Sequence, residues 1–220
     1  MRVVRHPLIA RCIRRNAVAV AAASVVLAAS SFAAVAVAQT GGAPDPMHSV
    51  QVQEGLCETT GGGEFVPIPG FPGESIDKRL LEDIAWMVHR YKIFITDGYS
   101  TSDVHAANGE HPIGLAIDVI PNTAVGGTWR KVTKLARWAE PAQNQPRAPF
   151  RWVGYNGDEG HGRGNHLHLS WMHSETKPKH PAETVYTRFC PAGSTPDPAP
   201  PTPQLNQILR GLPYSGPQHD

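Results

Sequence analysis

A histidine and aspartate pattern, matched by a pair of histidines further along the chain, restricts how this sequence can fold. The two parts read His111-x-x-Gly114-x-Ala116-x-Asp118 and His166-x-His168. Alternate side chains of a β-strand share one face, so His166 and His168 point the same way if they lie in a strand. Asp118 belongs to an apolar run, residues 115–119, that predicts a second strand. The pattern therefore predicts two strands of one sheet that bring these polar side chains together.

These side chains are the ligand types that zinc prefers. Zn²⁺ binds histidine nitrogen and carboxylate oxygen in a tetrahedron, and a catalytic zinc keeps one of its positions for water. His111 lies just before the strand that carries Asp118, and Gly114 lets the backbone turn tightly between them. We therefore predict that His111, Asp118 and His168 bind zinc and that His166 lies beside them as a spare histidine.

Apolar spacing around this pattern predicts the fold class. It indicates one helix from Ser75 as N-cap to about residue 91, and another from Thr128 as N-cap to about residue 138. Short apolar runs predict four strands, at residues 92–96, 115–119, 150–155 and 166–171. The loops between these elements vary too much for repeated βαβ units. We therefore expect an α+β fold, a single small domain whose central antiparallel sheet is flanked by helices.

The two ends of the chain differ in composition from its middle. Residues 1–38 pass from a basic segment through an alanine-rich apolar segment to Ala36-Val37-Ala38, which is the order of a secretory signal peptide. An uncleaved membrane anchor is the alternative, because the apolar run is long enough to span a bilayer. Residues 39–56 predict a flexible leader, 57–190 the folded domain, and 191–220 a disordered proline-rich tail. We expect an exported protein with no membrane span after cleavage.

The cysteines agree with export. Cys12 lies in the predicted signal peptide, which leaves Cys57 and Cys190 in the mature chain. An even pair in an exported protein predicts an intramolecular disulfide, and this one would join the start of the folded domain to its end. Two free thiols are the alternative.

Charge argues against one class of partner. The formal net charge of +1 gives no indication of the basic face that nucleic-acid binding requires. His168-Leu169-Ser170 raises the possibility of a phosphodiesterase or secreted nuclease, but a two-histidine phosphoesterase needs a second such motif and the chain has none. We therefore expect no nucleic-acid partner, and we expect a monomer.

The histidine and aspartate pattern resembles that of the LAS-type zinc peptidases, which comprise D-alanyl-D-alanine carboxypeptidases and dipeptidases together with peptidoglycan endopeptidases. Asp97-Gly98-Tyr99-Ser100, after a predicted strand, is similar to that family's Ser-Gly-Tyr-Arg. The resemblance covers roughly residues 75–171. It implies that His111, Asp118 and His168 are the zinc ligands and that the fold is a small α+β domain around an antiparallel sheet. It also implies a bacterial protein, secreted or associated with the cell wall, that cleaves D-Ala-containing bonds of peptidoglycan stem peptides or cross-links.

The chain departs from the family at three positions. Asn165 stands where many members have a glutamate as general base, Ser100 replaces the arginine, and Gly109 replaces a serine. His166 matches the members with a His-x-His motif. We therefore expect His166 to take the proton of the metal-bound water or to stabilise the oxyanion, with His161 in a supporting part.

A zinc-binding module without catalysis is the alternative function. The signalling domain of hedgehog proteins has the same fold and keeps zinc. Asn165 and Ser100 favour a zinc domain without catalysis, whereas His166 argues against it. The remaining histidines of the folded region are each expected to be surface or hydrogen-bonded groups; they are His89, His105, His173 and His180.

Overall fold

The structure is a computed structural model, and it describes residues 46–158, 161 and 165–197. These residues belong to one compact unit, Gly41–Asp220. The predicted signal peptide at 1–38 and most of the predicted tail lie outside the described residues. Within the described part of the chain, no helix is long and apolar enough to cross a membrane.

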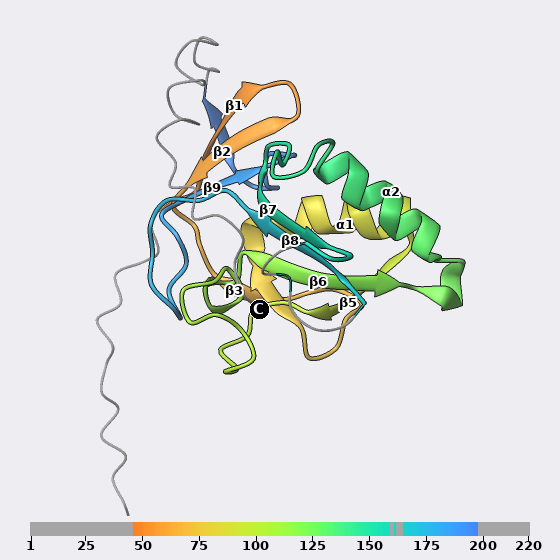
Figure 1. Ribbon diagram of the computed structural model, residues 1–220. Helices are drawn as coiled ribbons and strands as arrows, with labels where there is room; N and C mark the ends of the chain where they lie inside the picture. The colour runs from red at the N-terminus through yellow and green to blue at the C-terminus, as the bar shows by residue number, and fades with distance from the viewer. Residues whose placement is uncertain (1–45, 159–160, 162–164, 198–220) are drawn as a thin grey trace, which may run out of the picture. The chain divides into compact units, whose positions relative to one another are not determined.

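The middle of the chain forms a four-stranded antiparallel sheet (Figure 1). Across the sheet its strands are β5 (Ile93–Asp97), β6 (Ala116–Pro121), β8 (Leu167–Trp171) and β7 (Phe150–Tyr155). The α-helices are α1 (Leu81–Tyr91) and α2 (Trp129–Ala139). All four predicted strands and both predicted helices are present, so the α+β class is confirmed. The first helix begins later than Ser75, because 75–77 pair as a strand and Lys78–Leu80 form a 3-10 turn.

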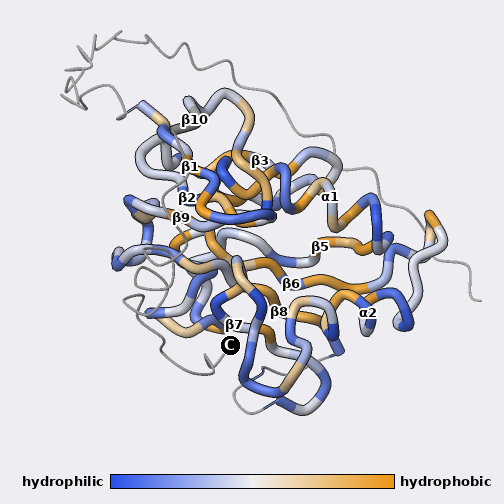
Figure 2. Tube along the Cα trace, turned by 90° about the horizontal axis from the view of Figure 1, so that it is seen from above, coloured by the Kyte–Doolittle hydropathy of each residue, from blue (hydrophilic) through white to orange (hydrophobic). Residues whose placement is uncertain are grey.

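The two faces of this sheet differ in chemistry. Along β6 and β8, Ile117 pairs with Leu169 and Val119 with Leu167, and all four side chains are buried in one core with residues of both helices. Figure 2 shows β5, β6 and β8 largely in the hydrophobic colours. The alternate positions, including the directly paired Asp118 and His168, face the other way. The sheet thus buries its apolar face against the helices and leaves the opposite face for polar groups.

A second sheet, in the order β10-β1-β2-β9, joins the two ends of the described chain. Its strands are β1 (His48–Gln53), β2 (Leu56–Thr60), β9 (Thr184–Thr187) and β10 (Thr195–Asp197). The predicted flexible leader at 39–56 is therefore wrong over β1, and the predicted tail at 191–220 is wrong over β10. β1 has no apolar pattern that would predict a strand, because its buried residues include Ser49. The Ser49 hydroxyl is hydrogen-bonded to Thr59 of β2, with 2.6 Å between the hydroxyl oxygens. β10 pairs in parallel with β1, and this long-range contact has no local apolar signal.

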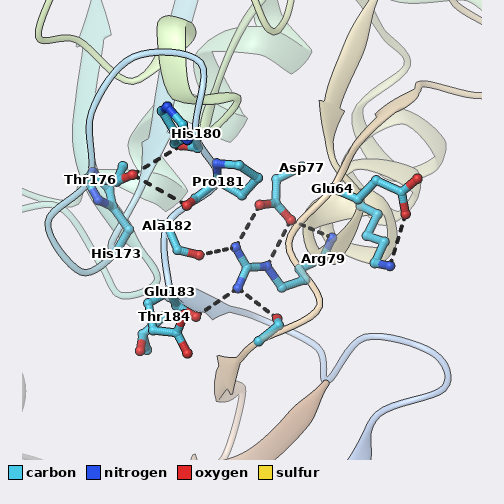
Figure 3. A network of polar contacts seen from close by, with 12 residues as sticks. Glu64, Asp77, Arg79, His173, Thr176, His180, Pro181, Ala182, Glu183 and Thr184 are labelled. Atoms are coloured by element: carbon cyan, nitrogen blue, oxygen red, sulfur yellow. Dashed lines mark hydrogen bonds and ion pairs between the residues drawn. The ribbon is translucent and has the colours of Figure 1, made fainter. Parts of the chain in front are cut away.

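A buried arginine fastens the second sheet to the short hairpin of β3 (Phe65–Pro67) and β4 (Ser75–Asp77) (Figure 3). A guanidinium has five N–H donors, and all five of Arg79 are used. Two bind the Asp77 carboxylate, and the others bind the carbonyl oxygens of Gly61, Ala182 and Glu183. Because every donor is paired, full burial of this charge is tolerated.

The predicted disulfide is confirmed. Cys57 of β2 is bonded to Cys190, with 5.2 Å between their Cα atoms and a sequence separation of 133. The bond closes nearly the whole folded domain into one covalent loop, as the sequence predicted.

A buried carboxylate holds the segment before Cys190 against α1. Asp83 accepts hydrogen bonds from the backbone N–H groups of Arg188 and Phe189 and from the indole N–H of Trp171, at 2.8–3.0 Å. Trp171 ends β8, so one side chain of α1 connects the central sheet with the chain that leads to the disulfide.

Candidate metal centre

The three predicted metal ligands lie together on the polar face of the central sheet. Nε2 of His111 is 3.4 Å from Oδ1 of Asp118, and Nδ1 of His168 is 3.0 Å from the same oxygen. The ligand atoms of all three residues lie within 4.8 Å of one another. Zinc ligands at bond lengths of about 2.0–2.2 Å in a tetrahedron are separated by roughly 3.3–3.6 Å. The donors therefore lie near the spacing that one tetrahedral ion requires.

Local structure explains how these residues meet. Asp118 and His168 are direct partners in the β6–β8 register. His111 begins a 3-10 turn, His111–Ile113, which ends at Gly114 with a φ of 68°. A side chain at Gly114 would be strained at this φ, and its Cβ would lie 2.7 Å from the Phe65 ring. The predicted tight turn is thus present, and it returns the chain from His111 into β6.

The ring of His111 is oriented for metal binding. Its Nδ1 donates to the carbonyl oxygen of Gly98 at 2.5 Å, which leaves the Nε2 lone pair directed toward Asp118. This Nε2 is buried and makes no hydrogen bond of good geometry to the described residues. A buried nitrogen without such a bond is costly in an apolar interior, and a metal ion would satisfy it. The three residues could therefore hold a metal ion.

Asp118 is suited to bind a cation. Burial by itself raises the pKa of this carboxyl, but the neighbouring His111 and His168 side chains outweigh burial and hold the pKa well below its usual range. The carboxylate therefore stays charged over the pH range in which proteins normally work. His168 is in turn fixed from the side by the Trp152 ring, with 4.7 Å between ring centroids.

Of the two predicted catalytic histidines, His166 lies beside Asp118, and His161 lies against His166. Nε2 of His166 is 3.6 Å from Oδ2 of Asp118. His111 and His168 both lie against the other oxygen, Oδ1. The rings of His166 and His161 are 4.4 Å apart, and His161 packs over Gly154. A Cβ at Gly154 would lie 2.6 Å from the His161 ring, so glycine makes room for this histidine.

Two further residues at the site were not predicted to have a role. Nε2 of His105 is 2.8 Å from Oδ2 of Asp97, and the His105 ring stacks on that of His111 with 4.1 Å between centroids and 28° between planes. His105 was expected to be a surface or hydrogen-bonded group, and it is hydrogen-bonded. The available signal was the position of Asp97 at the end of the strand next to Asp118.

Asp97, His105 and His111 also group closely enough to bind a metal ion. This group shares His111 with the first one. Because Nδ1 of His111 is bound to Gly98, only Nε2 remains for a metal ion. The two groups are therefore alternatives, and the fully buried set with Asp118 offers the better site.

An ion-pair cluster supports the chain just before His111. The carboxylate of Glu110 lies 2.7 Å from Nη1 of Arg151 in β7, and the same nitrogen donates to Nε2 of His173 at 2.8 Å. Nδ1 of His173 donates to the carbonyl oxygen of Ser174 at 2.6 Å. These contacts attach the His111 turn to the sheet, and His173 is one of the hydrogen-bonded histidines that the sequence predicted.

A large apolar cavity shares no residue with the metal centre. Its volume is about 1030 Å³, and the outward side of α1 lines it together with Phe71 and Phe94.

Comparison with protein-family models, curated proteins and solved structures gives no match to this chain.

Proposed function

We propose that this chain is a secreted zinc-dependent peptidase that cleaves peptidoglycan stem peptides or cross-links. The observation that carries the proposal is the meeting of His111, Asp118 and His168 at tetrahedral spacing on one face of the sheet. The resemblance of 97–100 and 111–118 to the LAS-type peptidases supplies the substrate class, and the disulfide is compatible with export.

Three protein ligands leave one tetrahedral position for a reactant. Zinc bound by these three residues would lower the pKa of a bound water to about 7 and polarise the scissile carbonyl. His166 lies on the side of Oδ2 of Asp118, where its Nε2 would accept a proton from water or donate one to an oxyanion of the substrate. His161 supports the His166 ring through their contact.

A zinc-binding module without catalysis is the second candidate. The observation that favours it is Asn165, which is exposed and has no proton-accepting carboxylate, at the position of the family's general base. Zinc would then stabilise the domain, and the polar face of the sheet would bind a cell-wall or protein ligand.

Metal analysis and digestion of muropeptides test the proposal. We expect the purified chain to hold one zinc ion and to cleave muropeptides, with both properties lost on treatment with a chelator. Asp118→Ala and His168→Ala should lose most of the zinc, since each removes a ligand. His89→Ala removes an exposed histidine of α1 and serves as the control.

The outcomes separate the two candidates. Mass spectrometry of the digests identifies the bond that is cleaved. Full zinc occupancy in both ligand variants rules out the assigned site. A zinc-loaded wild-type chain that cleaves no muropeptide supports the binding module instead.

A further inference from the structure

The His111 side chain is held from three directions. Gly98 fixes the edge of its ring through the hydrogen bond to Nδ1. The His168 ring meets it edge to face, with 5.1 Å between centroids and 68° between planes. The His105 ring covers its face at 4.1 Å. A single hydrogen bond leaves the ring free to swing about the bond axis, and a parallel ring against its face restricts that motion.

The His105 ring is itself fixed. Its side chain is 5% exposed, and Nε2 is bound to the carboxylate of Asp97, which is 31% exposed. The backbone N–H of His105 donates to the carbonyl oxygen of Ser102, which shapes the loop around it. Because an aspartate sets both the plane and the tautomer of a hydrogen-bonded histidine, the face presented to His111 is defined.

Both restraints originate at the end of β5. Asp97 binds His105, and the next residue, Gly98, accepts from His111. A Cβ at Gly98 would lie 2.4 Å from the carbonyl oxygen of Ser75, so this part of the chain is closely packed against β4. The end of β5 therefore controls the orientation of a ligand that lies on another segment.

We infer that Asp97 and His105 are positioning residues that hold the His111 imidazole in the orientation required for metal binding. This inference rests on the metal site of the proposed function and adds two residues to which no role was assigned. Partners outside the ligand set typically contribute 10–100-fold to metal affinity, because they orient a ligand before the ion arrives. The pair acts through His111 and needs no contact with the ion.

The test measures the dissociation constant for Zn²⁺ by competition with a chromophoric chelator. We expect His105→Ala to raise this constant about 10–100-fold. His105→Phe keeps a ring against His111 and should recover most of the affinity. Asp97→Ala should weaken binding more than Asp97→Asn, because asparagine keeps an oxygen that accepts from His105. His180→Ala removes an exposed histidine and serves as the control.

A second measurement separates positioning from general destabilisation. The absorption spectrum of the Co²⁺-loaded chain reports ligand geometry, and it should change in His105→Ala but not in His105→Phe. The melting temperatures of the metal-free variants show whether they fold; if His105→Ala does not, the Asp97 variants decide. Unchanged zinc affinity in folded His105→Ala, or equal losses in the Ala and Phe variants, overturns the inference. A wild-type chain that binds no zinc overturns the metal site itself.

Discussion

His166 lies beside the candidate metal centre and is partly exposed. Its Nε2 lies 3.6 Å from Asp118, and its side chain keeps 14% of its surface exposed. We expect His166→Ala to lower kcat on muropeptides by about 10²–10⁴-fold, the usual contribution of a general acid or base. Zinc content should stay near that of the wild type, because the three ligands are untouched.

Zinc analysis and kcat, measured on the same His166→Ala preparation, check this expectation. His161→Ala is the matched comparison and should lose less activity, since the part proposed for His161 is to support the His166 ring that it contacts. A His166→Ala enzyme with full activity would assign the proton transfer to another group, with His161 the first to examine.

At the residue scale, the grouping of His111, Asp118 and His168 could be predicted because local rules place them together. Strand alternation aligns Asp118 with His168, and Gly114 permits the turn that returns His111. Asp97 and His105 could not be predicted in the same way. The contact of the His105 ring with His111 depends on how a loop folds over the sheet edge, and no spacing in the sequence encodes that packing.

At the scale of elements, Asp83 of α1 gives the fold a dependence on pH. Burial raises the pKa of this carboxyl to about 6, although the three hydrogen bonds that it accepts lower the pKa. Its ordinary pKa is 3.8, so between these values the folded state binds more protons than the unfolded state. The stability that Asp83 contributes is therefore fully present below about pH 4 and is lost as the pH rises through about 6.

Asp83→Asn tests this dependence, because asparagine does not titrate. The stability advantage of the wild type over Asp83→Asn should be largest near pH 4. It should shrink by up to about 3 kcal/mol by pH 7, at 1.36 kcal/mol per pKa unit. Urea denaturation at several pH values measures it, with exposed Glu82→Gln as the control. A difference that stays constant with pH would contradict the assignment.

Elements with apolar periodicity were predicted and those without it were not. The central strands and both helices bury continuous apolar faces, which the sequence displays. β1 buries a serine that is hydrogen-bonded to Thr59 of β2, and β10 exists through its pairing with β1. Such strands form through pairing with distant partners, so the local sequence predicts a leader in place of β1 and a tail in place of β10.

At the scale of the whole molecule, the Cys57–Cys190 disulfide should contribute strongly to stability. It closes a loop with a sequence separation of 133, and a loop of that length restricts the unfolded chain. We expect reduction, or the double change Cys57→Ser and Cys190→Ser, to lower the free energy of unfolding by about 2–5 kcal/mol. Equilibrium urea denaturation measures the loss, and coincident curves for the oxidised and reduced chains would contradict it.

The same bond makes the folded part of the chain a closed ring. Residues 101–104 lie inside the ring and are exposed, so an extracellular protease that nicks the backbone there would cut a chain whose two pieces remain covalently joined. One piece would carry Asp97, and the other would carry His111, Asp118 and His168. A protein built in this way can survive a cut in its surface loop without losing either half to dilution.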